Sequence, residues 1–148
     1  MDSMRAVVQV ASQAKVEVEG AVVGELGAPG LVVLLGITHE DDQATTREVA
    51  EKIYRLRILE GETSAESQNA PLLVISQFTL YGSVRKGRRP SWTQAAGGAH
   101  SEPLYDYFVS YLRELGAEVA TGRFGAMMEV SLTNSGPVTL LVDSADLP

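Results

Sequence analysis

Four consecutive residues at the end of an apolar run could line a reaction site. Ser76, Gln77, Phe78 and Thr79 follow the run Leu72 to Ile75, which predicts a buried strand. At the end of such a strand, polar side chains and free backbone N–H groups can meet a cleft. Ordinary strand termination, with Phe78 in the core, is the alternative.

A second segment, from Asn134 to Thr139, has the sequence Asn-Ser-Gly-Pro-Val-Thr and separates two apolar runs. Proline donates no ladder hydrogen bond and is confined in sheets to edges and bulges, so Gly136-Pro137 should interrupt the pairing. Only about 5–6% of X-Pro bonds are cis. The residues alone therefore favour a simple turn.

A third segment is basic. Four of the twelve Lys and Arg residues, Arg85, Lys86, Arg88 and Arg89, lie within five positions of a chain whose net charge is −7. The negative total argues against broad electrostatic binding of nucleic acid. The cluster predicts either a solvated loop or a local phosphate-binding site that positions one end of an RNA.

Several catalytic devices are missing from the sequence. There is no cysteine, and the two histidines, His39 and His100, do not have metal-ligand spacing. No GxSxG, Walker A or GxGxxG motif occurs. We therefore expect no metal and no cofactor, and we expect His39 to be structural or exposed to solvent.

The elements that position these segments follow from hydrophobic periodicity. Apolar or alternating runs predict strands, and apolar residues at three- and four-residue steps predict two amphipathic helices. The predicted strands are 5–10, 15–19, 21–26, 30–37, 72–75 running into 76–81, 117–121, 126–132 and 138–142; the predicted helices are 41–59, which Asp41 and Asp42 open, and 102–115; the predicted loops are 60–70 and 82–98. We expect one α+β domain over residues 1–148, with a mostly antiparallel or mixed sheet, barrel-like or two-layered, and two helices packed on it.

Composition sets the broad class. Hydrophobic residues make up 45% and charged residues 21% of the chain, so a folded protein is expected. No signal peptide is visible at the N-terminus, and the longest apolar runs, such as Leu31 to Leu35, are far shorter than the ~20 residues that cross a bilayer. We expect a cytoplasmic protein that does not contact a membrane.

Taken together, the motifs resemble those of the D-aminoacyl-tRNA deacylases, the D-tyrosyl-tRNA deacylase family. The matching blocks occur in the family's order and cover the chain from Met4; they are Met4 to Gln9, Gly36 to Glu40, Ser76 to Tyr81, Lys86 to Trp92, Phe124 to Ala126 and Asn134 to Thr139. The combination of SQFTL and NxGPVT is highly specific, although either motif alone would be weak. The resemblance implies hydrolysis of the ester that joins a D-amino acid to tRNA, which proofreads translation.

The resemblance also implies a homodimer. In the family, the Gly136-Pro137 peptide is cis and reaches into the active site of the partner subunit, where its carbonyls face the amino acid. Rigid carbonyls can hold the substrate ammonium and exclude an L side chain, while D-amino acids and glycine, including glycine mischarged on alanine tRNA, still enter. The expected partners are a second copy of the chain and tRNA that carries a D-amino acid; no DNA partner is expected.

The remaining roles carry over position by position. The resemblance implies that backbone N–H groups around Phe78 and Thr79 stabilise the oxyanion, and that the 2′-hydroxyl of the terminal adenosine helps to activate water. The residues expected to bind substrate or tRNA are Phe124, Met128, Asn134, Lys86, Arg88 and Arg89. Phe124 and Met128 match positions near the adenosine pocket, although core packing would equally explain both.

The chain departs from the family pattern at Val10, where an arginine usually helps to fix the Gly-Pro motif, and at Gly82, where alanine is more usual. Three other functions remain open: an esterase with Thr79 as nucleophile, a structural dimerisation domain, and a non-catalytic nucleic-acid-binding module built on Arg85 to Arg89. The negative net charge and the lack of aromatic residues between the basic ones count against the binding module.

Overall fold

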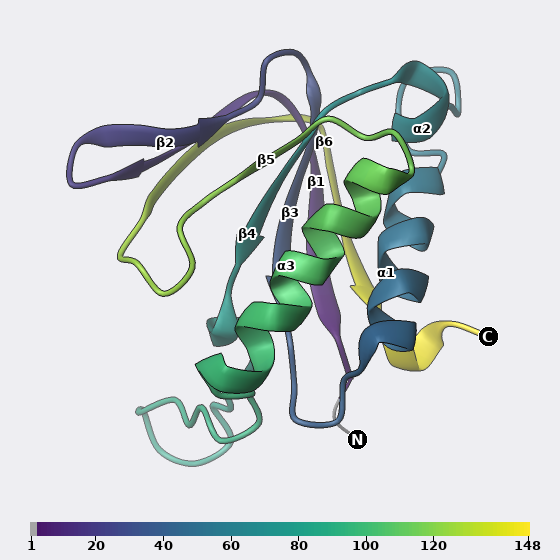
Figure 1. The fold of residues 1–148 in the computed structure, drawn as a ribbon. Helices are drawn as coiled ribbons and strands as arrows, with labels where there is room; N and C mark the ends of the chain where they lie inside the picture. Colours follow the sequence, from purple (N-terminus) through teal and green to yellow (C-terminus); the bar gives the residue numbers. More distant parts are fainter. Residues whose placement is uncertain (1–2) are drawn as a thin grey trace.

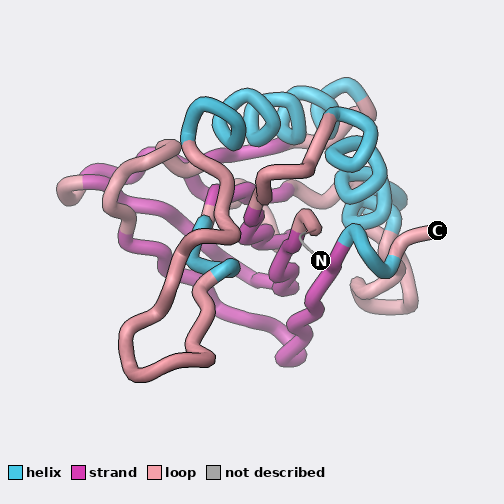
Figure 2. Tube along the Cα trace, turned by 90° about the horizontal axis from the view of Figure 1, so that it is seen from below, coloured by secondary structure: helices cyan, strands magenta, loops and turns pink. Residues whose placement is uncertain are grey.

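The computed structural model describes residues 3–148 and has two long helices packed on one face of a six-stranded mixed sheet (Figures 1 and 2). The predicted α+β class and mixed sheet are confirmed. The strands are β1 (Arg5–Val18), β2 (Ala21–Glu25), β3 (Gly30–Gly36), β4 (Leu72–Ser76), β5 (Val119–Thr121) and β6 (Glu129–Asp143); the α-helices are α1 (Gln43–Arg55), α2 (Ala65–Gln68) and α3 (Gly98–Glu114); the 3-10 helices are η1 (Phe78–Tyr81) and η2 (Ser144–Asp146). Within residues 3–148, no helix has the length and apolarity needed to cross a membrane.

The sheet is organised around β1. Its strand order is β2-β1-β3-β4-β5, with β6 also paired to β1. The β3–β4 and β4–β5 pairs are parallel, whereas β2, β3 and β6 all pair with β1 in the antiparallel sense. No second strand in the described part of the chain pairs with β6, so the long outer edge of β6 is open.

Two predicted strand boundaries are wrong, although the predicted interruption of pairing at Gly136-Pro137 is confirmed, because residues 135–138 of β6 have no partner on β1. The two strands predicted at 5–10 and 15–19 form the single strand β1, and the two predicted at 126–132 and 138–142 form the single strand β6. The polar Ser12 and Gln13 lowered the local strand signal, but β6 pairs along both halves of β1 and absorbs the irregularity in register shifts between Gln9 and Gln13. Long-range pairing has overridden local composition here.

The observed helix boundaries differ from the predicted ones, and local hydrogen bonds at the helix ends explain part of the difference. Asp42 caps α1, and its carboxylate accepts a hydrogen bond from Thr45 N at 2.8 Å. The helix ends at Arg55 and not at the predicted residue 59, because Leu56 is extended and the chain after it packs against the core. The predicted loop 60–70 contains the short helix α2, which a Ser64–Ser67 capping box opens. Helix α3 begins at Gly98, before the predicted start at residue 102.

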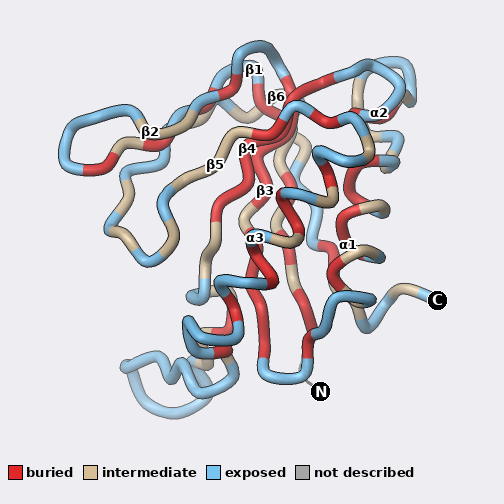
Figure 3. Tube along the Cα trace, in the orientation of Figure 1, coloured by how far each residue is buried: buried red, intermediate tan, exposed pale blue. Residues whose placement is uncertain are grey.

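The apolar core lies on both faces of the sheet (Figure 3). Val49 and Ile53 of α1 and Phe108 and Leu112 of α3 are fully buried against the helix-facing side chains of β1, β3 and β4. A smaller cluster that includes Val16 and other strand residues lies on the opposite face. Strand β4 therefore runs between two apolar layers, and its polar C-terminal end is held in a defined place.

Candidate active site

A pocket of about 450 Å³ opens where β4 ends. All four predicted catalytic residues, Ser76 to Thr79, line this pocket, and so do the predicted adenosine-site residues Phe124 and Met128. Phe124 and Met128 come from the segment between β5 and β6, which lines the pocket together with the end of β4. The fold thus brings together two segments that the family resemblance had assigned to one site.

The chain turns sharply after β4 and exposes backbone donors. Gln77 N donates to Leu35 O at 2.8 Å, which extends the β3–β4 pairing by one residue. The chain then enters η1, where Leu80 N donates to Gln77 O and Gly82 N to Thr79 O. The N–H groups of Phe78 and Thr79 have no hydrogen-bond acceptor among residues 3–148. Two adjacent unpaired donors at a pocket mouth can receive a developing negative charge.

No side chain from residues 3–148 that lines the pocket is ionisable. Besides the residues named above, the lining consists of Leu35, Ile37, Ile75, Ala96, Gly98, Ser101, Gly125, Ala126 and Val130. The Thr79 hydroxyl accepts a hydrogen bond from Gln77 Nε2 at 2.8 Å, and an amide cannot take a proton from it. His39 and His100 contact the backbone oxygens of Thr93 and Asp41, both at 2.9 Å. Thr79 therefore lacks the adjacent base that a threonine nucleophile requires.

A buried tyrosine supports the pocket wall. The Tyr105 hydroxyl donates to Val74 O at 2.6 Å, and its ring lies 6.0 Å from that of Phe124. Burial raises the pKa of Tyr105 to about 12. The hydroxyl consequently stays protonated near neutral pH and ties α3 to β4 without acting as a base.

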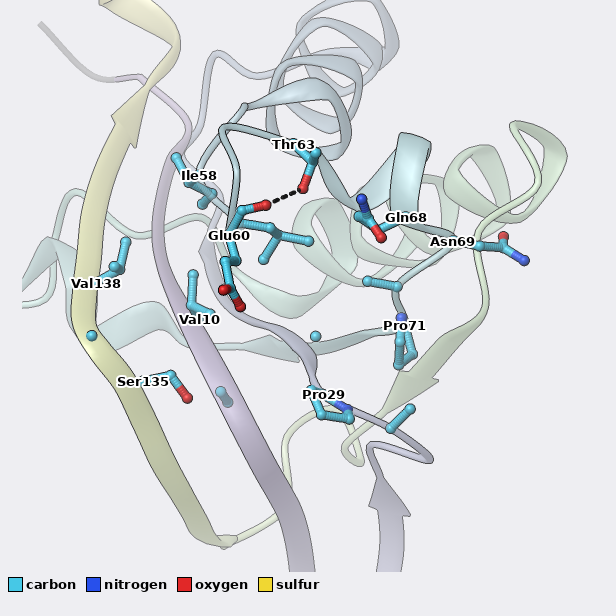
Figure 4. Close-up of a pocket in the computed structure, with 16 residues that line it drawn as sticks. Val10, Pro29, Ile58, Glu60, Thr63, Gln68, Asn69, Pro71, Ser135 and Val138 are labelled. Carbon is cyan, nitrogen blue, oxygen red and sulfur yellow. Dashed lines mark hydrogen bonds between the residues drawn. The ribbon is translucent and has the colours of Figure 1, made fainter.

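The Gly136-Pro137 segment lies away from this pocket, at the rim of a second cavity of about 800 Å³ (Figure 4). Val10 of β1 and Ser135 and Val138 of β6 face the loop that carries Ile58 and Glu60 across this cavity. The Gly136-Pro137 peptide is cis, and both residues are exposed. Within one subunit, the segment points its backbone to solvent and does not line the pocket at β4.

Only glycine fits at position 136. Its φ is +115°, and a Cβ atom there would lie 2.6 Å from Val138 Cγ2 and 2.8 Å from Val138 N. An L residue would be strained in this backbone conformation, and its side chain would also collide with Val138.

The side-chain amide of Asn134 links the Gly136-Pro137 segment to strand β1. Its Nδ2 donates to Val10 O at 2.8 Å and to Val138 O at 2.9 Å, and its Oδ1 accepts from Thr139 Oγ1 at 3.2 Å. Asn134 was expected to bind substrate; in the structure its amide bonds to Val10 on β1 and to Val138 and Thr139, which follow the Gly136-Pro137 peptide. Strand β1 thus braces the segment through the backbone of Val10, although this position lacks the arginine that the family resemblance led us to expect.

The basic cluster forms the tip of a hairpin, the teal-green loop below α3 in Figure 1. Ser83 and Ser91 exchange two backbone hydrogen bonds of 2.8 Å at its base. Lys86, Arg88 and Arg89 are exposed and do not line the pocket. Sequence reasoning missed Trp92, which follows the hairpin and lies with its ring centroid 5.4 Å from that of Phe78. A tryptophan three residues after the basic run was the available signal.

In the family comparison, residues 7–143 match the model described as D-Tyr-tRNA(Tyr) deacylase. A protein of Cutibacterium acnes named D-aminoacyl-tRNA deacylase is 59% identical over 143 residues, which cover 97% of this chain and 99% of that protein. A protein of the same name from Nocardia farcinica is also 59% identical, with 95% and 100% covered.

Two solved structures have the same fold. One, described as a c-Myc DNA unwinding element binding protein, is 36% identical with a TM-score of 0.84 and covers 93% of this chain and 97% of its own. The other, described as a probable eukaryotic D-amino acid tRNA deacylase, is 18% identical with a TM-score of 0.82, covers 95% and 99%, and supports the fold alone.

Proposed function

The chain belongs to the D-Tyr-tRNA(Tyr) deacylase family, and we propose that its pocket at the end of β4 hydrolyses the ester bond of D-aminoacyl-tRNA. The observation that carries this assignment is the pocket's composition: backbone donors and hydroxyl and amide groups at the mouth, apolar walls, and no ionisable side chain. Such a pocket suits an activated ester, whose hydrolysis needs charge stabilisation more than a protein nucleophile.

Water is the nucleophile in this reaction. It adds to the ester carbonyl carbon, and the N–H groups of Phe78 and Thr79 donate to the resulting oxyanion. The 2′-hydroxyl of the terminal adenosine accepts the water's proton and relays it. The carbonyl carbon then releases the ribose 3′-oxygen, which takes up a proton, and the products are a free D-amino acid and tRNA. Phe124 and Met128 provide an apolar wall for the adenine.

The partner subunit's Gly136-Pro137 peptide completes the site. Two features of the single subunit support a dimer: the open edge of β6 and the apolar side chains on the sheet face away from the helices. Leu141 of β6 is 80% exposed and pairs with Val7, which pairs with Leu34 on that face. A second copy that covers this face would shield these apolar side chains from water. It would also bring its exposed Gly136-Pro137 peptide toward the pocket of the first copy.

The carbonyls of that peptide hold the substrate ammonium and leave no room for an L side chain. Glycine, including glycine mischarged on alanine tRNA, has no side chain to exclude and is also a substrate. The reaction belongs to the cytoplasm, where tRNA is charged, and it proofreads translation. Lys86, Arg88 and Arg89 contribute phosphate contacts that hold the 3′ end of the tRNA.

The test is turnover with both enantiomers. Purified protein should release D-tyrosine from D-Tyr-tRNA at least about a hundredfold faster than L-tyrosine from L-Tyr-tRNA, since a clash with a rigid wall costs about 3 kcal/mol or more. Equal rates for the two esters would reject the chiral selection, and release of neither amino acid would reject the deacylase assignment.

A further inference from the structure

Two large aromatic side chains stand exposed together at the mouth of the pocket. Phe78 is 56% exposed and Trp92 is 41% exposed, and their rings meet edge to face with centroids 5.4 Å apart. Phe78 also lines the pocket, so the pair forms a continuous apolar surface from the pocket to the base of the hairpin. No other Phe, Tyr or Trp side chain among residues 3–148 is exposed, and Tyr54, Tyr81 and Phe108 are almost wholly buried.

The surrounding backbone holds the tryptophan in place. The paired Ser83 and Ser91 fix the base of the hairpin immediately before Trp92. Gly82 lies directly beneath the indole, since a Cβ atom there would stand 2.6 Å from Trp92 Cζ3. Ala95 N donates to Trp92 O at 3.1 Å and closes the turn that follows. The indole is therefore a positioned, partly exposed surface on an ordered hairpin.

The same hairpin carries a local excess of positive charge. Arg85, Lys86, Arg88 and Arg89 are all exposed, and none of them takes part in the four salt bridges found within residues 3–148. On a chain with a net charge of −7, these four cations mark the hairpin as the part that would attract an anionic chain. Aromatic side chains beside free cations are the combination that binds unpaired nucleotides, because bases stack on the rings while the cations meet the phosphates.

We propose that Phe78 and Trp92 form a stacking subsite for the unpaired nucleotide that precedes the terminal adenosine of the aminoacyl-tRNA. The inference rests on the proposed function, which places the terminal adenosine in the pocket that Phe78 borders. The nucleotide leaving that pocket meets the aromatic pair first and the cationic hairpin next. Because every base has a π-face, the subsite contributes affinity for the 3′ end without selecting one base.

The experiment compares two substrates that differ only in this nucleotide. One is 3′-O-D-tyrosyl-adenosine, a single nucleoside, and the other is the same ester on a CA dinucleotide. The wild-type protein should hydrolyse the dinucleotide ester with the higher kcat/KM. In Trp92→Ala the ratio of the two kcat/KM values should fall by between about fivefold and about a hundredfold, which is the range that one lost stacking contact supplies.

Three matched variants separate stacking from other effects. Trp92→Phe keeps a stacking face and should retain most of the ratio, whereas Gly82→Ala should lower it, because the new methyl group displaces the indole without removing it. Val84→Ala, at a 74% exposed position on the same hairpin, should retain the wild-type ratio.

The outcomes distinguish this subsite from the reaction itself. A wild-type protein that hydrolyses both esters with equal kcat/KM, or a Trp92→Ala variant with an unchanged ratio, would overturn the subsite and leave the deacylase assignment standing. Hydrolysis of neither ester by the wild-type protein would overturn both.

Discussion

The residues that line the pocket provide backbone hydrogen-bond donors in fixed positions and little acid–base chemistry. Among residues 3–148, the N–H groups of Phe78 and Thr79 have no acceptor, the Thr79 hydroxyl is bonded to an amide, and no carboxylate, imidazole or amine lines the site. The ester is expected to be hydrolysed by water that the RNA's own hydroxyl activates, with the protein stabilising the oxyanion.

Thr79→Ala tests whether hydrolysis depends on the backbone N–H of this residue and not on its hydroxyl. The substitution removes the hydroxyl and keeps the backbone N–H, so deacylation of D-Tyr-tRNA should fall by no more than about tenfold, the scale of one lost hydrogen bond. Single-turnover rates give the measurement, and circular dichroism checks the fold. A drop of about four orders of magnitude in a folded variant would instead establish a threonine nucleophile.

Asn134 offers a second test at this scale. Asn134→Asp has nearly the same shape but cannot donate to the carbonyls of Val10 and Val138, so two hydrogen bonds are lost. We expect the free energy of unfolding to fall by about 1–3 kcal/mol and discrimination against L-Tyr-tRNA to weaken. Gln13→Ala is the matched control, because it breaks the exposed Gln13–Thr133 bond elsewhere between β1 and β6. An Asn134→Asp variant that matches Gln13→Ala in stability and in selectivity would show that the Gly136-Pro137 segment does not depend on the hydrogen bonds of Asn134.

At the scale of elements, the sequence predicted what local patterns determine. The run ending at Ser76 identified β4 and the pocket edge, and Asp42 marked the start of α1. The continuity of β1 and β6 was missed, because their pairing joins residues that are far apart in the chain. The contact of Phe78 with Trp92 and the bond from Asn134 to Val10 were missed for the same reason, since neither partner is visible in the local sequence.

The exposed cations of the hairpin lead to a prediction about tRNA binding. Replacing Arg88 and Arg89 together with alanine should weaken tRNA binding and reduce the slope of log K against log salt by up to about two, because each lost phosphate contact removes roughly one released counterion. Both side chains are exposed, so the melting temperature should stay within a few degrees of the wild-type value. Filter binding over a salt series provides the slope, and an unchanged slope and affinity would identify the cluster as a solvated loop.

At the scale of the whole molecule, the two parts of the proposed site lie in separate places on the chain. The pocket lies at the end of β4, whereas the Gly136-Pro137 peptide lies at the rim of another cavity and faces solvent. The proposed dimer would cover the open edge of β6 and the exposed Leu141. The central claim is therefore that each deacylation site combines the pocket of one subunit with the peptide of the other.

Mixed dimers test that claim most directly. Ala126→Trp fills the pocket and leaves the peptide intact, while Gly136→Val disrupts the peptide, where a Cβ atom collides with Val138, and leaves the pocket intact. Each variant alone should be inactive on D-Tyr-tRNA. Co-expressed with different tags and purified through both, the mixed dimer joins one intact pocket to one intact peptide and should regain about half of the wild-type rate. A folded mixed dimer that remains inactive would contradict the shared site.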